Sequence, residues 1–380
     1  MRKLALIIGL VAAVIGGLAL SWNLQTRALA EALVADLAAT KARVIARTPV
    51  PRAPLHENGF ACVGAMMDVT APDFAPFYGK QKADLDGFIT GAQPISDLAP
   101  EVKTKMQSFS AWASSLRACG DSAKLAYVDG ITPWAPQEQP RTARLADSVP
   151  ALIEFTALEL RLLIADGQSD VALERCTQTW AMVTDQSHLG LLGALQARMA
   201  VRRLAPACGV ALAAAKPDVR AQVAKQWEPL NGRLAPAHEL IELERLHVSL
   251  LVFAWVSPES IRAQLPLASS LGADLRRRVA VGRMWRAWDQ AMRKFIAVAD
   301  APGAERVAAA NAVDATNELE GSAPYAKYLG AAEETALLLG LLTDLASGST
   351  NPLPAGVTKT ERGLEYDNGE GQKLLIPTAP

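Results

Sequence analysis

The hydrophobic and polar positions of this chain follow three patterns, one after another. A charge-free apolar run fills Leu4–Leu20, helical spacing of apolar residues dominates the long middle, and short alternating segments with turn residues close the chain. The first two patterns are typical of α-helices and the third is typical of β-strands. We therefore expect a mainly α protein: an N-terminal transmembrane helix, an array of stacked antiparallel helical hairpins, and a small C-terminal β-hairpin.

The apolar run follows Arg2 and Lys3 and ends at Ser21 and Trp22. At ~1.5 Å per helical residue, residues 4–22 span roughly 28 Å, close to the ~30 Å hydrocarbon core of a bilayer. Positive residues ahead of such a run favour a cytoplasmic N-terminus. In a bacterium with two membranes this predicts a single-pass inner-membrane protein whose bulk is periplasmic. The predicted anchor residues are Leu4, Ile7, Val11, Ile15, Leu20 and Trp22.

Two other interpretations of the N-terminus stay open. Ala28-Leu29-Ala30 offers a small-x-small site for signal peptidase, and cleavage there would give a secreted protein. The run could also be a buried core helix of a cytosolic protein. The distance of the cleavage site from the run, and Arg27 just before it, favour an anchor that is retained.

Breaks in the pattern divide the chain into four predicted regions. They are a membrane anchor (1–22), a stalk helix with a proline-rich spacer (23–54), an α-helical exported domain (55–348), and a β-hairpin with a tail (349–380). The proline cluster at Thr48–Pro54 ends the stalk helix. In the last region, Asp367-Asn368-Gly369 supplies a turn between predicted strands at Val357–Tyr366 and Gln372–Ile376.

The most regular helical pattern begins at Pro150, which suits the first turn of a helix that ends at Gly167. Ser169 then begins a second helix, and the short loop makes the two antiparallel neighbours. The stretch Ala165–Trp180, ADGQSDVALERCTQTW, resembles the turn and second helix of a tetratricopeptide repeat, over about half of one repeat. No 34-residue period follows, so we infer stacked helical hairpins outside that family.

Composition narrows the class of function only slightly. With 38 basic and 39 acidic residues the net charge is −1, which argues against nucleic-acid binding. The four cysteines contain no CxxC pair, and in an oxidising compartment disulfides are expected. Sequence order suggests Cys62–Cys119 and Cys176–Cys208. The other two pairings, and buried free thiols, remain alternatives.

One segment suggests a binding surface. On a helix through Arg276–Lys294, basic side chains gather on one side and large apolar ones gather on the other. The basic side could bind an anionic envelope polymer, lipid headgroups or the carboxylates of a partner protein. Alternatively, it is the solvated face of an ordinary core helix, paired with the acidic helix before it. The residues of this predicted binding face are Arg276, Arg283, Arg286, Arg293 and Lys294.

Catalytic signatures are scarce. No nucleophile elbow, phosphate loop or dinucleotide motif is present, and we predict no cofactor and no metal site. His238 and Glu242 share a helix face, but His247 points away, so three metal ligands do not converge. The expected function is a non-catalytic binding or scaffolding protein of the envelope. The alternative is a periplasmic hydrolase that uses Glu154 and Glu159, or His238 with Glu242, on an envelope polymer. The oligomeric state stays open.

Overall fold

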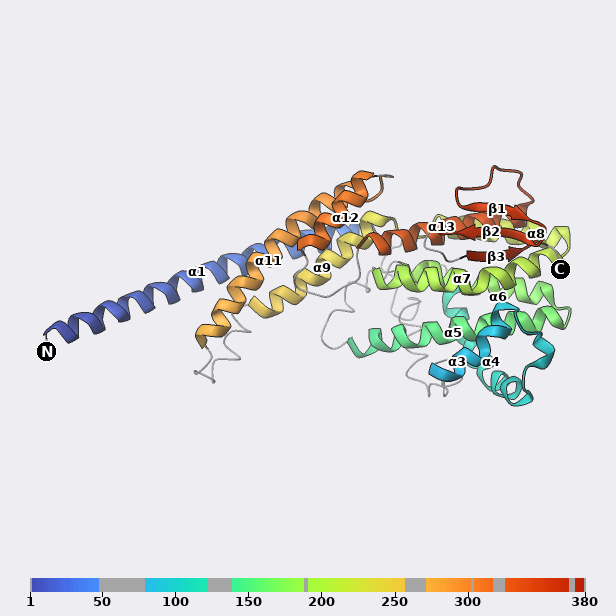
Figure 1. The fold of residues 1–380 in the computed structure, drawn as a ribbon, viewed down its shortest axis with the longest axis horizontal. Helices are drawn as coiled ribbons and strands as arrows, with labels where there is room; N and C mark the ends of the chain where they lie inside the picture. Colours follow the sequence, from blue (N-terminus) through green and yellow to red (C-terminus); the bar gives the residue numbers. More distant parts are fainter. Residues whose placement is uncertain are drawn as a thin grey trace. The chain divides into compact units, whose positions relative to one another are not determined.

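The structure is a computed structural model that describes residues 2–47, 79–121, 139–187, 191–256, 271–301, 304–316, 325–368 and 373–378. Its described part is mainly helical and carries a small antiparallel sheet near the C-terminus, which confirms the predicted fold class at this level (Figure 1). The helices are α1 (Arg2–Arg47), α3 (Gly79–Thr90), α4 (Pro100–Asp121), α5 (Gln139–Ala165), α6 (Ser169–Gln186), α7 (Leu191–Ala214), α8 (Pro217–Asn231), α9 (Ala237–Val256), α11 (Leu271–Val298), α12 (Ala304–Thr316) and α13 (Tyr325–Ser347), with a 3₁₀ turn at Ile95–Asp97.

The chain separates into two compact units. Unit 1 consists of Met1–Arg47 and Ala237–Ala326, and unit 2 consists of Thr48–Pro236 and Lys327–Pro380. Each unit therefore combines segments from distant parts of the sequence, and the division falls near the start of α13. Unit 1 contains α1, α9, α11 and α12, whereas unit 2 contains α3 to α8, most of α13 and the sheet.

The core of unit 1 forms where α1, α9 and α12 pack against α11. Trp285, Trp288, Met292 and Phe295 of α11 are buried, which confirms the apolar face predicted for this segment. Leu29 of α1 is also buried and lies against Gly282 of α11, where a Cβ atom would collide with the leucine side chain. The absent side chain at residue 282 thus lets α1 and α11 approach closely.

Helix α1 is continuous for 46 residues, and its two halves have different surroundings. Leu29 and Leu33 are buried, whereas large apolar side chains of the first half are exposed in the isolated chain. Of the predicted anchor residues, Val11, Ile15 and Leu20 are exposed, and the side chains of Leu4, Ile7 and Trp22 lie outside the described part. Among the described residues, no helix combines the length and the apolar character that a membrane crossing requires.

Unit 2 is built around α5, α6 and α7, which contact one another, with α4 and α8 against α6 and α3 against α5 and α7. Trp180 of α6 and Trp227 of α8 are almost fully buried, and their ring centroids are 4.4 Å apart. The helices differ from the prediction at Pro150, which lies inside α5 and not in its first turn. Helix α7 also contains a proline, Pro206, within its length. A proline inside a helix costs ~3 kcal/mol, and burial of residues such as Leu152 and Leu204 can offset this.

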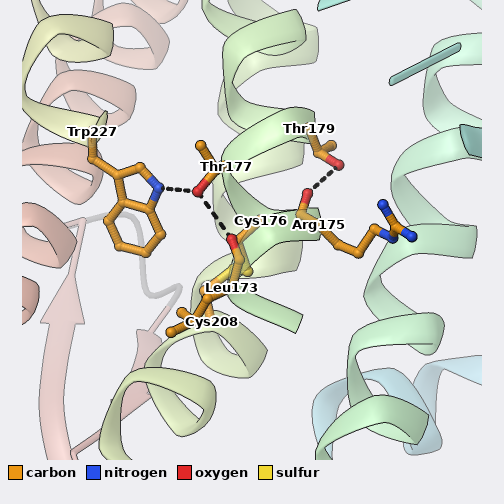
Figure 2. Close-up of a disulfide and its surroundings, with 7 residues drawn as sticks. All are labelled: Leu173, Arg175, Cys176, Thr177, Thr179, Cys208 and Trp227. Carbon is orange, nitrogen blue, oxygen red and sulfur yellow. Dashed lines mark hydrogen bonds between the residues drawn. A yellow bond between two sulfur atoms is a disulfide. The ribbon is translucent and has the colours of Figure 1, made fainter. Parts of the chain in front are cut away.

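A disulfide between Cys176 and Cys208 joins α6 to α7, which confirms the predicted pairing (Figure 2). Their Cα atoms are 6.3 Å apart and both residues are buried. Cys62 lies outside the described residues, and so does the side chain of Cys119, so the other predicted bridge stays a prediction.

The C-terminal segment forms a three-stranded antiparallel sheet in the order β1 (Val357–Thr360), β2 (Gly363–Asp367), β3 (Lys373–Pro377). The sequence suggested one strand at Val357–Tyr366, but Glu361 and Arg362 form a tight turn within it, followed by Gly363 at φ +140°. Strand β3 packs on α7. A Cβ atom on Gly209 would lie 2.7 Å from Ile376 Cγ2 and 2.9 Å from Pro377 O, so glycine permits this contact.

Candidate binding site

A cavity of about 460 Å³ lies in unit 2 among α3, α5, α7 and β3. Its size falls within the ~300–1,000 Å³ range of small-molecule sites. About half of its lining is apolar and the rest carries both signs of charge. The apolar residues are Ile89, Leu195, Met199, Pro206 and Leu374, and the polar ones are Asp86, Thr90, Glu154, Arg198, Arg202 and Arg203.

Two of the three arginines share a single carboxylate. Arg198 and Arg202 are four residues apart on α7, so they occupy the same helix face. Arg198 Nε lies 2.5 Å from Glu334 Oε2, and Arg202 Nη1 donates to Glu334 Oε1 at 2.6 Å. The Glu334 side chain, on α13, is only 3% exposed. This buried carboxylate therefore holds both guanidinium groups at the cavity wall.

The third arginine, Arg203, lies between two carboxylates. Arg203 Nε donates to Glu154 Oε2 at 2.7 Å, and its Nη2 contacts Asp86. Burial lowers the pKa of Arg203 from its usual value. Glu154 and Asp86 thus flank Arg203 on this side, whereas Arg198 and Arg202 both pair with Glu334 on the other. The positive potential of the cavity is therefore concentrated at Arg198 and Arg202.

Tyr366 of β2 lies within the field of this cluster. The residue is 8% exposed, and burial is the main cause that raises the pKa of its phenol. The negative charge of Glu334 acts in the same direction, whereas Arg202 and Arg198 oppose it. The phenol is therefore protonated at neutral pH.

The two glutamates suggested for hydrolysis are held by different arginines. Glu154 faces Arg203 of α7, whereas Glu159 accepts a hydrogen bond from Arg117 Nη1 of α4 at 2.6 Å. Arg117 is fully buried and also donates to Thr156 at 3.1 Å. Only Glu154 lines the cavity. The structure does not bring the two acids together in one cleft.

His238 has a partner outside α9. The His238 ring pairs with Asp300, whose Oδ1 accepts the His238 backbone N–H at 3.1 Å. Glu242 is buried at 3% exposure, and the His247 side chain lies outside the described part. Within the ranges that the structure describes, no group of three or more potential ligands could hold a metal ion.

The predicted basic face of α11 is only partly available. Arg283, Arg286 and Lys294 are exposed, and the Arg276 side chain lies outside the described residues. Arg293 is committed to ion pairs, at 2.9 Å to Asp289 and 2.7 Å to Asp36 of α1. Burial acts to lower the Arg293 pKa, but the hydrogen bonds to these two aspartates outweigh it and raise the pKa.

The arginines of α7 were not among the predicted site residues. A signal was present in the sequence, because Arg198 and Arg202, one helical turn apart, and the adjacent Arg203 interrupt a mostly apolar helix. Their acidic partners could not be identified in this way, since Glu334 is 132 residues from Arg202. Comparisons of the chain with protein-family models, with curated proteins and with solved structures found no match.

Proposed function

We propose that this chain is a membrane-anchored helical binding and scaffolding protein of the cell envelope. In this proposal, Leu4–Leu20 crosses the inner membrane and the two folded units lie in the periplasm. The support comes from the sequence of that run, from the positive residues ahead of it, and from the contrast between the two halves of α1.

The contrast within α1 carries the proposal. Six large apolar side chains of its first half are 49–68% exposed among those described: Leu10, Val11, Val14, Ile15, Leu18 and Leu20. An apolar face of this size without a covering element is typical of a membrane or partner contact. The second half is fixed within unit 1, because Leu33 is fully buried and Asp36 pairs with Arg245 and Arg293. One helix therefore joins an uncovered apolar segment to a folded body.

The packing of the second half of α1 within unit 1 also argues against signal-peptide cleavage. The proposed cleavage site, Ala28-Leu29-Ala30, includes a residue that is 4% exposed and packed against Gly282. Cleavage after Ala30 would remove this contact from the core of unit 1. We therefore propose that the anchor is retained.

A binding role fits the buried acids better than hydrolysis does. A glycan hydrolase uses two carboxylates on opposite sides of one bond, roughly 5–9.5 Å apart. Glu154 and Glu159 instead pair with Arg203 and Arg117, on two different helices. In these positions the acids join α5 to α7 and α4. Their chemistry is that of structural ion pairs.

The basic residues of α11 are the proposed contact with anionic lipid or envelope polymer. Leu29 lies beside Gly282, and Asp36 pairs with Arg293, so α1 and α11 run in the same direction. Leu29 follows Trp22 by seven residues, or about 10 Å of helix. Arg283 is adjacent to Gly282, so in this proposal it is near the membrane surface, within about one Debye length.

The test is membrane extraction of the full chain with a reporter, active only outside the cytosol, fused after Pro380. We expect an active reporter and full-length protein that resists extraction with alkaline carbonate. A Val11→Arg/Ile15→Arg double variant should become extractable, because a charge at the centre of a span costs about 2.5–3.5 kcal/mol. Val307→Arg is the matched control, since Val307 is 48% exposed on α12 and should not affect anchoring. Wild-type protein in the carbonate supernatant, or an inactive reporter, would refute the proposal.

A further inference from the structure

We infer that the cavity among α3, α5, α7 and β3 binds a small ligand with a singly charged oxyanion, a carboxylate or a phosphodiester, on a short apolar body. Arg198 and Arg202 would hold the oxyanion. This inference concerns unit 2 alone, so it does not depend on whether α1 crosses a membrane.

The distribution of charge gives the sign and number of charges on the ligand. Arg198 and Arg202 both pair with Glu334, so two guanidinium groups meet on this side of the cavity. They attract a ligand that carries a negative charge. A second negative charge would extend toward Glu154 and Asp86, which already surround Arg203, and would be repelled. The cavity therefore favours a monoanion over a dianion.

The arginines are fixed in place before any ligand arrives. Glu334 is 3% exposed and binds Arg198 Nε and Arg202 Nη1, which leaves the planar guanidinium groups oriented by a buried partner. An arginine has five N–H donors, and a fork of two donors matches the two oxygens of a carboxylate or phosphodiester. Little side-chain entropy is then lost on binding. A lysine at these positions would not provide this geometry.

The apolar lining determines the rest of the ligand. Leu195, Met199 and Pro206 contribute one wall from α7, and Leu374 of β3 contributes another. Met199 precedes Arg202 by less than one helical turn, so the apolar surface adjoins the proposed oxyanion position. A short alkyl or aromatic group attached to the oxyanion would bury its surface here. A bare inorganic ion would lack this contact.

The test is isothermal titration calorimetry, in which sodium hexanoate is titrated into the purified full-length protein in detergent. Three further compounds are titrated in the same way. Dibutyl phosphate tests a phosphodiester in place of the carboxylate, hexanol is a probe without charge, and hexylammonium is a probe with a positive charge. We expect binding of hexanoate, of dibutyl phosphate or of both, and none of hexanol or hexylammonium at the same concentrations. Affinity should fall with added salt, because the interaction is ionic.

Variants separate a ligand contact from a structural role. Arg202→Gln should weaken binding roughly tenfold or more, as expected for loss of a charged hydrogen bond. Glu334→Gln should strengthen binding, because loss of the carboxylate that competes for both arginines outweighs loss of its ordering effect on them, although it should lower stability. A purely structural role of Glu334 would weaken binding instead. Arg362→Gln is the control, since Arg362 is an exposed residue of the β1–β2 turn.

If Arg202→Gln does not fold, Leu195→Glu gives the same information. It keeps every ion pair named above and adds a negative charge at the cavity wall, so it should abolish binding. Equal binding of hexanol and hexanoate, unchanged affinity in Leu195→Glu, or no heat with either oxyanion probe would overturn the inference. None of these results would bear on membrane extraction, which tests the proposed function separately.

Discussion

Arg245 of α9 and Asp289 of α11 form a buried salt bridge in unit 1, with Arg245 Nε 2.6 Å from Asp289 Oδ1. Arg245 also pairs with Asp36 of α1, and Arg293 bridges both aspartates, so the four residues form a closed ring. The Arg245 side chain is only 1% exposed. This ring joins three helices whose residues are far apart in the sequence.

Loss of Arg245 should destabilise unit 1. Removing one partner of a buried ion pair leaves the other charges poorly solvated, which typically costs about 3–5 kcal/mol. Because Arg293 still contacts both aspartates, we expect Arg245→Ala to lower the free energy of unfolding by about 3 kcal/mol. Urea unfolding followed by the fluorescence of the buried tryptophans Trp285 and Trp288 would measure this. Arg286→Ala, at an exposed position on α11 in the same unit, should change stability by less than ~0.5 kcal/mol.

Reduction of the Cys176–Cys208 disulfide should destabilise unit 2. The two cysteines are 32 residues apart, and the chain-entropy model gives about 3–4 kcal/mol for closing a loop of this length. We expect a Cys176→Ser/Cys208→Ser variant to unfold at a correspondingly lower urea concentration. Mass spectrometry of unreduced digests should recover the two peptides joined. Alkylation of both thiols in the denatured, unreduced protein would contradict the bridge.

Gly209→Ala should weaken the contact between α7 and the sheet. A Cβ atom there would approach Pro377 O to 2.9 Å, and a backbone atom cannot move aside without shifting β3. Gly340 of α13 has no atom within 4 Å of the equivalent position and is the matched control. Replacing a helical glycine with alanine normally stabilises a helix by ~0.5–1 kcal/mol. We expect Gly340→Ala to raise the melting temperature and Gly209→Ala to lower it.

Thr177→Val should leave a buried indole without an acceptor. Trp227 Nε1 donates to Thr177 Oγ1 at 2.8 Å, and that hydroxyl donates to Leu173 O (Figure 2). Since Trp227 is 1% exposed, water cannot replace the hydroxyl, and we expect a loss of about 1–3 kcal/mol. In the control, Thr179→Val, the lost hydroxyl donates to Arg175 O of its own helix, so the cost should be smaller. Equal losses in denaturant titrations would contradict this account.

The raised pKa of Tyr366 predicts a loss of stability in alkali. Burial is its main cause, so the folded protein keeps the phenol protonated at a pH where the unfolded chain ionises. The contribution of Tyr366 to the free energy of unfolding is fully present below about pH 10, the usual pKa of tyrosine. It is lost as the pH rises toward the pKa of the phenol in the folded protein. Above about pH 10, the free energy of unfolding should therefore fall less steeply with pH in Tyr366→Phe than in the wild type. Parallel slopes of unfolding free energy against pH would contradict the prediction.

The sequence by itself determined the local features of this protein. Apolar spacing predicted the mainly helical body and the buried face of α11 that contains Trp285, Trp288, Met292 and Phe295. Turn residues predicted β structure after Gly348, and cysteine order predicted the Cys176–Cys208 bridge. These features depend on neighbours within a few turns of helix or on a small set of possible pairs, so a pattern of residue types is sufficient to predict them.

Only the tertiary structure decided which charges meet. Arg293 looked like part of an open basic face, but its partner Asp36 is 257 residues away on α1. The cavity likewise depends on Arg202 of α7 and Glu334 of α13, which are 132 residues apart. Helix periodicity tells which side of a helix is polar, but not which helix packs there. The choice of partner follows from packing of distant helices, where burial makes each arginine and carboxylate require the other.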